Sequence, residues 1–141
     1  LPVVIAAKDA SCVGIAHAGW RGLSNGILES LLTTLPVAPA QLFVWLGPAI
    51  SVNAYEVGDE VRQCLLKTQG EAALHYFNPS ARTTGHWMAD LSGLATLILH
   101  RAGIDTITAS RSCTVAQPQD FFSHRRDGPA TGRMATVVWR A

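Results

Sequence analysis

The sequence has few of the features that mark several large classes of protein. Its three cysteines, Cys12, Cys64 and Cys113, are an odd number without Cys-x-x-Cys spacing, which argues against a disulfide framework or zinc knuckle and favours a reducing compartment. No apolar run reaches the ~18 residues that a membrane span requires, so we expect no membrane partner. Charged residues are only 15% of the chain and the net charge is +1, which gives no general case for nucleic acid.

What the sequence does contain is apolar. Hydrophobic residues make up 48% of the 141 positions, which predicts one domain over residues 1–141 with a substantial core. The chain opens on Leu1, not on methionine, and residues 1–7 are typical of a buried strand from the first position. We therefore expect this chain to be a fragment of a longer protein.

The order of periodic segments predicts an α+β domain with a mixed sheet. Apolar runs at 3–7 and 12–16, separated by a polar turn, indicate a hairpin. Helical spacing is expected at 23–35, 57–65 and 91–103, the last capped by Asp90. Further strands are expected at 42–46, 104–109 and 133–139, the first of them buried throughout, with a long polar loop at 117–132.

The segment Ala16–Gly22 gathers the most chemistry. His17 lies at the turn from strand to helix, where an imidazole can bind a metal or move a proton. Arg21 can bind a phosphate or carboxylate, and the glycines let backbone amides approach an anion. The alternatives are a histidine packed beside Trp20 and an arginine in a surface ion pair.

A second concentration of polar residues spans 124–127. Arg125 and Arg126 beside His124 could recognise a phosphate or an anion linked to ribose. Alternatively, this is a solvated loop in which Asp127 neutralises one arginine. Cys113 with His124 as its base would make a hydrolase, although a free cysteine is usually a small buried hydrophobe.

Four segments in order resemble one family: Ala16–Gly22, then Leu46–Ile50 with Tyr55–Gly58, then Cys113-Thr114, and last Phe121–Asp127 with Thr131–Met134. This set resembles the laccase-domain (YfiH-like) family of purine nucleoside phosphorylases, also described as multicopper polyphenol oxidoreductases. The chain is similar to the C-terminal part of that family and lacks its N-terminal segment.

The resemblance implies a cytoplasmic, metal-dependent enzyme that performs phosphorolysis of adenosine- and inosine-type nucleosides, and adenosine deamination. It implies an α+β fold with mixed β-sheets layered with α-helices, zinc as cofactor with copper as the alternative, and purine nucleoside and phosphate as partners. By resemblance His17 is a catalytic residue and one of three metal ligands; the other two, a histidine and a cysteine, match positions before Leu1. We expect a monomer or weak homo-oligomer.

Phosphorolysis needs cations that hold phosphate beside the sugar, and Arg21, Arg125 and Arg133 are the candidates for substrate binding. One alternative is a copper-dependent polyphenol oxidase, although multicopper oxidation needs more histidine ligands than this chain carries. The other is an inactive or structural fragment, because one imidazole does not complete a zinc site of about three protein ligands.

Overall fold

In the computed structural model, which describes residues 1–140, the first two apolar runs pair as predicted. β1 (Pro2–Ala7) and β2 (Val13–His17) form an antiparallel hairpin in which Pro2 lies opposite His17. The polar turn between them is closed by the Asp9 carboxylate, which accepts a hydrogen bond from the backbone N–H of Ser11 at 2.9 Å. The hairpin brings the imidazole-bearing end of β2 beside the start of β1.

The hairpin belongs to a four-stranded sheet of mixed direction, with the strand order β2-β1-β3-β7. β3 (Leu42–Leu46) runs antiparallel to β1, whereas β7 (Ile107–Ala109) runs parallel to β3. The predicted α+β class with a mixed sheet is confirmed. The expectation that 42–46 is buried throughout is wrong, because Phe43 and Trp45 are 42% and 37% exposed while Val44 is fully buried.

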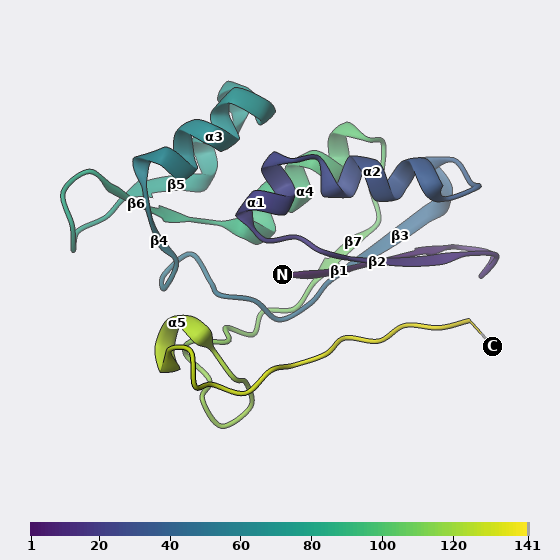
Figure 1. Cartoon of the computed structure of the whole chain (residues 1–141). Helices are drawn as coiled ribbons and strands as arrows, with labels where there is room; N and C mark the ends of the chain where they lie inside the picture. Colours follow the sequence, from purple (N-terminus) through teal and green to yellow (C-terminus); the bar gives the residue numbers. More distant parts are fainter. Residues whose placement is uncertain (141) are drawn as a thin grey trace.

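That alternation arises because the helices cover one face of this sheet. α1 (Trp20–Ser24), α2 (Ile27–Thr34) and α4 (Leu91–Arg101) lie on one side of it, and the C-terminal segment lies on the other (Figure 1). The core between sheet and helices is made by fully or almost fully buried aliphatic side chains, among them Val3, Ile5, Leu23, Leu28, Val44, Leu94 and Leu99. The face away from the helices keeps its aromatic side chains partly exposed.

The single helix expected at 23–35 is split in two. Gly26 has φ 75°, in the left-handed region, and this residue ends the first helical segment at the junction between α1 and α2. The helical segment also begins earlier than expected, at Trp20. Trp20 and Arg21 therefore belong to a separate five-residue helix directly after His17.

A second sheet has the order β4-β6-β5, with β4 (Glu56–Gly58), β5 (Phe77–Pro79) and β6 (His86–Ala89). The sequence pattern did not predict these short strands. α3 (Asp59–Gln69) follows β4, so the second helix starts at Asp59 and not at Val57. Two 3₁₀ turns, η1 (Pro39–Gln41) and η2 (Glu71–Tyr76), complete the connections.

The third predicted helix is confirmed together with both of its end signals. The Asp90 side chain caps α4 by accepting a hydrogen bond from the Gly93 N–H at 2.9 Å. Gly103, with φ 87°, follows its end in the left-handed conformation. Within residues 1–140, no helix combines the length and apolarity needed to cross a bilayer.

The C-terminal part differs most from expectation. The strand expected at 104–109 is shorter, and residues 133–139 form no strand. Val137 and Trp139 are 72% and 77% exposed, because no neighbouring strand pairs with this segment and β-propensity alone does not make a strand. The predicted polar loop contains one short helix, α5 (His124–Asp127).

Candidate functional site

Two clefts meet at Tyr55 and Arg125, which line both of them. The larger, here called the apolar cleft, has a volume of about 960 Å³ and is lined mainly by His17, Trp45, Ile50, Phe121, Phe122 and His124. The smaller, here called the polar cleft, has a volume of about 440 Å³ and is lined mainly by Trp20, Arg21, Glu56, Glu60, Thr83 and His86. Both volumes fall in the range of small-molecule sites.

His17 is placed as its sequence position predicts, at the end of β2 and at the wall of the apolar cleft. The adjacent Ala18 N–H donates to the carbonyl oxygen of Leu1 at 2.7 Å, which holds the start of the chain beside the imidazole. Burial lowers the pKa of His17. The ring is therefore kept neutral, the form that binds metals.

His17 has no partners for a metal among the described residues. Within residues 1–140, no group of three or more His, Cys, Asp or Glu side chains is arranged to hold a metal ion. A catalytic zinc needs about three protein ligands and an open position. The described residues alone therefore do not fit zinc or copper, and His17 offers a single donor.

Arg21 and Arg125 come together on the polar cleft. The Arg21 guanidinium lies over the Trp20 ring at 4.5 Å from the ring centroid, and Arg125 lies over Tyr55 at 5.2 Å. Burial raises the pKa of Tyr55, and the charges of Arg125 and Arg21 act against this shift, so both cations lie near the phenol. Within residues 1–140, no salt bridge joins either guanidinium to a carboxylate. The surface ion pair considered for Arg21 is therefore absent there.

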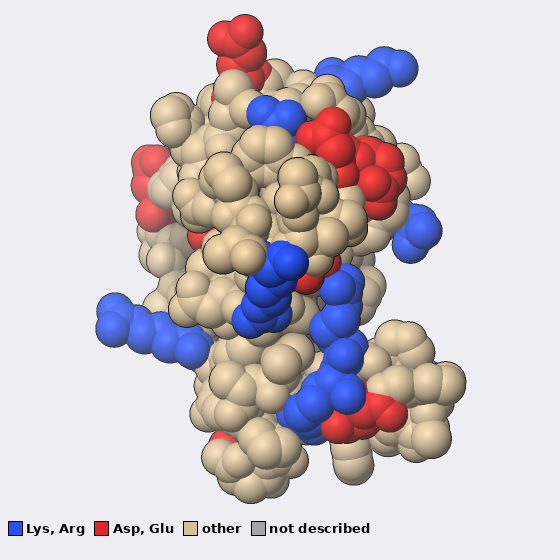
Figure 2. Space-filling view, turned by 90° about the vertical axis from the view of Figure 1, so that its left-hand side faces the viewer, with Lys and Arg blue, Asp and Glu red and all other residues tan. Residues whose placement is uncertain are grey.

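Basic side chains are conspicuous on this side of the molecule. Figure 2 shows Lys and Arg side chains gathering across the middle of the face that carries β4, α3 and α5. Most of the acidic side chains visible on that face lie in its upper part. This face therefore offers positive charge to an anion that approaches the clefts.

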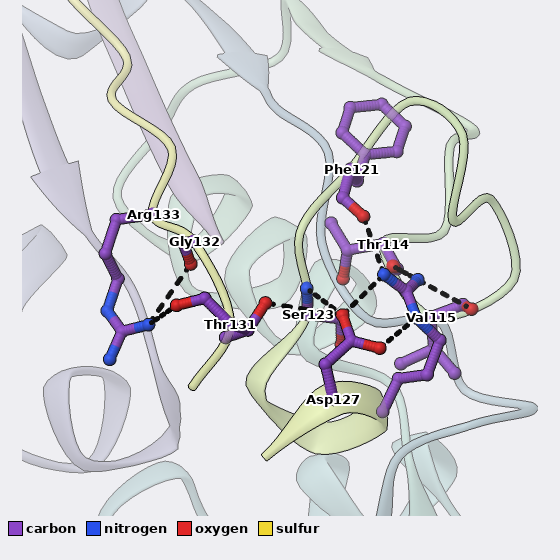
Figure 3. A network of polar contacts seen from close by, with 9 residues as sticks. Thr114, Val115, Phe121, Ser123, Asp127, Thr131, Gly132 and Arg133 are labelled. Atoms are coloured by element: carbon purple, nitrogen blue, oxygen red, sulfur yellow. Dashed lines mark hydrogen bonds and ion pairs between the residues drawn. The ribbon is translucent and has the colours of Figure 1, made fainter. Parts of the chain in front are cut away.

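The guanidinium of Arg126, unlike that of Arg125, is bound by several carbonyl oxygens and a carboxylate. Its guanidinium donates to the carbonyl oxygens of Thr114 at 2.8 Å, Val115 at 3.2 Å and Phe121 at 2.9 Å. It also binds both carboxylate oxygens of Asp127 at 2.7 Å (Figure 3). The hydrogen bond from Arg126 lowers the pKa of Asp127. The expectation that Asp127 neutralises one arginine of this pair is confirmed for Arg126.

Arg133 is placed apart from the other two candidate arginines. Its guanidinium donates to the carbonyl oxygens of Thr131 at 2.7 Å and Gly132 at 3.1 Å (Figure 3). Its side chain lines neither cleft, although the next residue, Met134, lines the apolar one. The structure does not bring Arg133 to Arg21 and Arg125.

Cys113 is held by backbone groups and not by His124. Its sulfur accepts a hydrogen bond from the Ser51 N–H at 3.4 Å, and within residues 1–140 no hydrogen bond joins it to His124. Burial acts to raise the pKa of the thiol, but hydrogen bonds from Ser51, Ala116 and Val115 outweigh it and bring the pKa to about 7. Cys113 lines neither cleft, so the cysteine–histidine pair of a hydrolase is not formed.

Sequence reasoning missed two polar residues of the polar cleft. From the sequence, Glu56 is expected to have a structural role near the start of the second helix, whereas the structure places it on β4 at the wall of the cleft. His86 lies on β6, in a strand that the pattern did not predict. Neither residue has a local sequence signal for its role, because the cleft is assembled from distant segments.

Known proteins match the chain over its whole length. The family model described as multi-copper polyphenol oxidoreductase laccase matches residues 1–141. A purine nucleoside phosphorylase of Xylella fastidiosa is 44% identical over 141 residues, covering 99% of this chain and 53% of the relative. Purine nucleoside phosphorylase YfiH of Escherichia coli is 37% identical over 139 residues, covering 99% of this chain and 55% of the relative.

A solved structure has the same fold. The crystal structure of the Neisseria meningitidis protein NMB0706 superposes with a TM-score of 0.83 at 39% identity. The match covers 90% of this chain and 51% of the other. The chain thus spans about half the length of the relatives that it matches.

Proposed function

The chain belongs to the multi-copper polyphenol oxidoreductase laccase family, which confirms the YfiH-like resemblance, and from that premise we propose that it carries part of a metal-dependent purine nucleoside phosphorylase. Several relatives are named purine nucleoside phosphorylase. The observation that carries the proposal is Arg125, which lies between a cleft containing His17 and a cleft containing Arg21. One residue thereby joins an apolar site for a base to a cationic site for phosphate.

The proposed reaction breaks the N-glycosidic bond with phosphate as the nucleophile. A phosphate oxygen forms a bond to the anomeric carbon of ribose, and the electron pair of the broken bond leaves on the purine, which takes up a proton. Positive charge builds on the ribose in the transition state, so phosphate held close to it lowers the barrier. Arg21 and Arg125 supply this positioning, because neither is neutralised by a carboxylate within residues 1–140.

The apolar cleft supplies a place for the purine. Phe121, Phe122 and Ile50 give it apolar walls of the kind that bind flat heterocycles. His17 opens onto the same cleft and is the catalytic candidate there, as a neutral imidazole that can hold a proton or serve as one metal ligand. A metal bound with additional ligands would polarise the substrate or activate water, and activated water would account for deamination.

Arg133 takes a smaller part in this proposal. Its guanidinium is bound to carbonyl oxygens of its own loop, so contact with phosphate would require it to leave them. We therefore place the main phosphate contacts on Arg21 and Arg125. A cytoplasmic location and a monomeric or weakly homo-oligomeric state complete the proposal.

Copper-dependent oxidation of phenols is the second candidate function, and the family description favours it. The third reading, an inactive fragment, follows from the incomplete metal ligand set within residues 1–140. Calorimetric titration with zinc distinguishes an inactive fragment from the two candidate enzyme functions. Tight stoichiometric binding to this chain would contradict the inactive reading, and weak or absent binding would support it.

The deciding experiment measures hypoxanthine released from inosine with and without phosphate, in the presence of zinc, by the protein that joins this chain to the upstream histidine and cysteine implied by the resemblance. We expect release to depend on phosphate and to fall about tenfold or more in Arg21→Ala and Arg125→Ala, because each removes a charge-assisted contact. Arg111→Ala is the matched control, since Arg111 is exposed and lines neither cleft. Oxidation of a phenol under added copper without phosphate-dependent release would contradict the proposal.

A further inference from the structure

The side chains that line the polar cleft have no clear surplus of positive charge. Arg21 and Arg125 line it together with the carboxylates of Glu56 and Glu60, so two permanent cations are matched by two anions. A phosphate dianion in the cleft would meet repulsion from both carboxylates as well as attraction from both guanidiniums. A further cation beside the cleft would therefore favour the bound anion.

Arg82 lies in the loop that joins β5 to β6, residues 80–85, which projects beyond the second sheet (Figure 1). The residue that follows it, Thr83, lines the polar cleft directly. The first residue of the loop is tied to the cleft as well, because the Ser80 hydroxyl donates to Glu56 Oε1. The loop therefore contacts the cleft on both sides of Arg82.

The guanidinium of Arg82 is bound to the same short segment of chain as that of Arg125. Its Nη2 donates to the Asn53 carbonyl oxygen at 3.5 Å, and Arg125 Nη1 donates to the Glu56 carbonyl oxygen at 2.8 Å. Asn53 and Glu56 lie on either side of Tyr55, which lines both clefts. The two guanidiniums are thus held by nearby carbonyl oxygens beside the polar cleft.

The charge of Arg82 already acts on the cleft. The hydrogen bond from Ser80 is the main cause that holds the pKa of Glu56 below its ordinary value, and the positive charge of Arg82 contributes to the same shift. Glu56 lines the cleft, so the field of Arg82 reaches into it. Within residues 1–140, no carboxylate forms a salt bridge with Arg82, and its charge is therefore available to an anion.

The present contact of Arg82 is weak. A separation of 3.5 Å exceeds the usual range of about 2.7–3.2 Å for an N–H···O hydrogen bond, and the side chain is exposed. Exposed side chains change rotamer within nanoseconds, so little holds the guanidinium on Asn53. A charge-assisted hydrogen bond to phosphate is both shorter and stronger than this contact.

We propose that Arg82 is a third phosphate-binding residue of the polar cleft, beside Arg21 and Arg125. On binding, its guanidinium leaves the Asn53 carbonyl oxygen and donates to phosphate oxygens. Three guanidiniums facing two carboxylates give the cleft the excess of positive charge that favours a dianion. The inference rests on the proposed function, since the anion it concerns is the phosphate of that reaction.

The backbone of the loop needs no rearrangement for this contact. The Ser80 N–H donates to the His86 carbonyl oxygen at 2.9 Å, and the His86 N–H donates to the Thr83 carbonyl oxygen at 3.1 Å. The hydrogen bond from Ser80 to Glu56 ties the same end of the loop to β4. Binding of phosphate therefore orders one exposed side chain and leaves the second sheet unchanged.

The first test is isothermal titration of the whole chain with inorganic phosphate at constant ionic strength. We expect Arg82→Ala to lower the affinity about fivefold or more, because one charge-assisted contact is lost. Arg82→Lys keeps the charge but not the paired donors, so it should lose less affinity than Arg82→Ala. Arg111→Ala is the matched control, since Arg111 is an exposed arginine that lines neither cleft.

The second test follows the Arg82 side chain itself by limited proteolysis. Trypsin binds the arginine side chain after which it cleaves, so an arginine engaged by phosphate is a poorer target. Saturating phosphate should slow cleavage between Arg82 and Thr83 about threefold or more, because cleavage follows the population of the accessible form. Cleavage after Arg111, read from the same fragment masses, should keep its rate. A merely structural role of Arg82 would give no such protection.

An affinity for phosphate in Arg82→Ala equal to that of the native chain would overturn the inference. Absence of phosphate binding to the native chain, or an unchanged rate of cleavage after Arg82, would overturn it as well. These outcomes are separate from those of the proposed function. Phosphate-dependent hypoxanthine release that is unchanged in Arg82→Ala at low phosphate would keep the function and reject the role of Arg82. Loss of phosphate affinity in Arg82→Ala without any hypoxanthine release would keep the contact and reject the function.

Discussion

The two sides of α5 carry the same residue type and do different work. Arg126 is bound by three carbonyl oxygens and a carboxylate, whereas Arg125 has one carbonyl partner and lies over an aromatic ring between two clefts. Arg126 therefore joins the 114–121 loop to α5, and Arg125 keeps donors for a ligand. The contrast shows that a pair of neighbouring arginines is not one anion site, because the partners of each decide its role.

The largest expected effect is on folding stability. Arg126→Ala removes the guanidinium that donates to the loop carbonyl oxygens and pairs with Asp127. We therefore expect the free energy of unfolding to fall by about 3 kcal/mol. Arg125→Ala should change it by less than about 1 kcal/mol, since one exposed hydrogen bond and the stacking on Tyr55 are lost. Urea unfolding followed by tryptophan fluorescence measures both, and equal losses would remove the distinction between the two sides.

The next effect concerns anion binding. Arg125→Ala should lower the affinity of the chain for inorganic phosphate about tenfold, because a charge-assisted contact is lost. Arg133→Ala should change the affinity less than about twofold, since its guanidinium is satisfied by its own loop. Calorimetry on the folded variants tests this, and an equal loss in the Arg133 variant would move the phosphate site toward the C-terminal segment.

The smallest expected effect is the pH dependence of the stability that the Arg126–Asp127 ion pair contributes. The folded-state pKa of Asp127 is lowered, so its stabilising contribution is complete above the unfolded value of 3.8 and is lost as the pH falls through the folded pKa. The difference in unfolding free energy between the native chain and Asp127→Asn should therefore shrink below about pH 4. Thermal unfolding from pH 7 to pH 3 checks the sign, and a difference that grows on acidification would contradict it.

Much of the fold could be predicted wherever local signals and tertiary contacts agree. The hairpin follows from two apolar runs around a polar turn, and α4 follows from Asp90 and Gly103 at its ends. The prediction of one continuous helix over 23–35 was wrong. The apolar spacing continues across Gly26, but the backbone of this residue breaks the helix. Residues 133–139 have strand-forming side chains but no partner strand, which sequence periodicity does not detect.

The site could be predicted only in part, for a related reason. His17 was placed correctly because its strand and helix are adjacent in the sequence. Arg125 and Arg126 could not be told apart, because their partners lie about 10 to 70 residues away, at Thr114 and Glu56. His86 joins the polar cleft only once β6 and its neighbours are assembled.

The length of the loop before α5 determines which side chain of this helix lies between the clefts and which one binds the loop carbonyls. Adjacent helical residues project about 100° apart, so a one-residue change of register moves each side chain into its neighbour's place. An added residue would keep a guanidinium in the anchoring position and move the His124 imidazole into the place of Arg125 between the two clefts, replacing a permanent charge by a titratable one. A lost residue would keep a guanidinium at the clefts and put Asp127 where the loop carbonyls need a donor. Insertions and deletions in this loop would thus separate binding from stability, as Arg125→Ala and Arg126→Ala do one residue at a time.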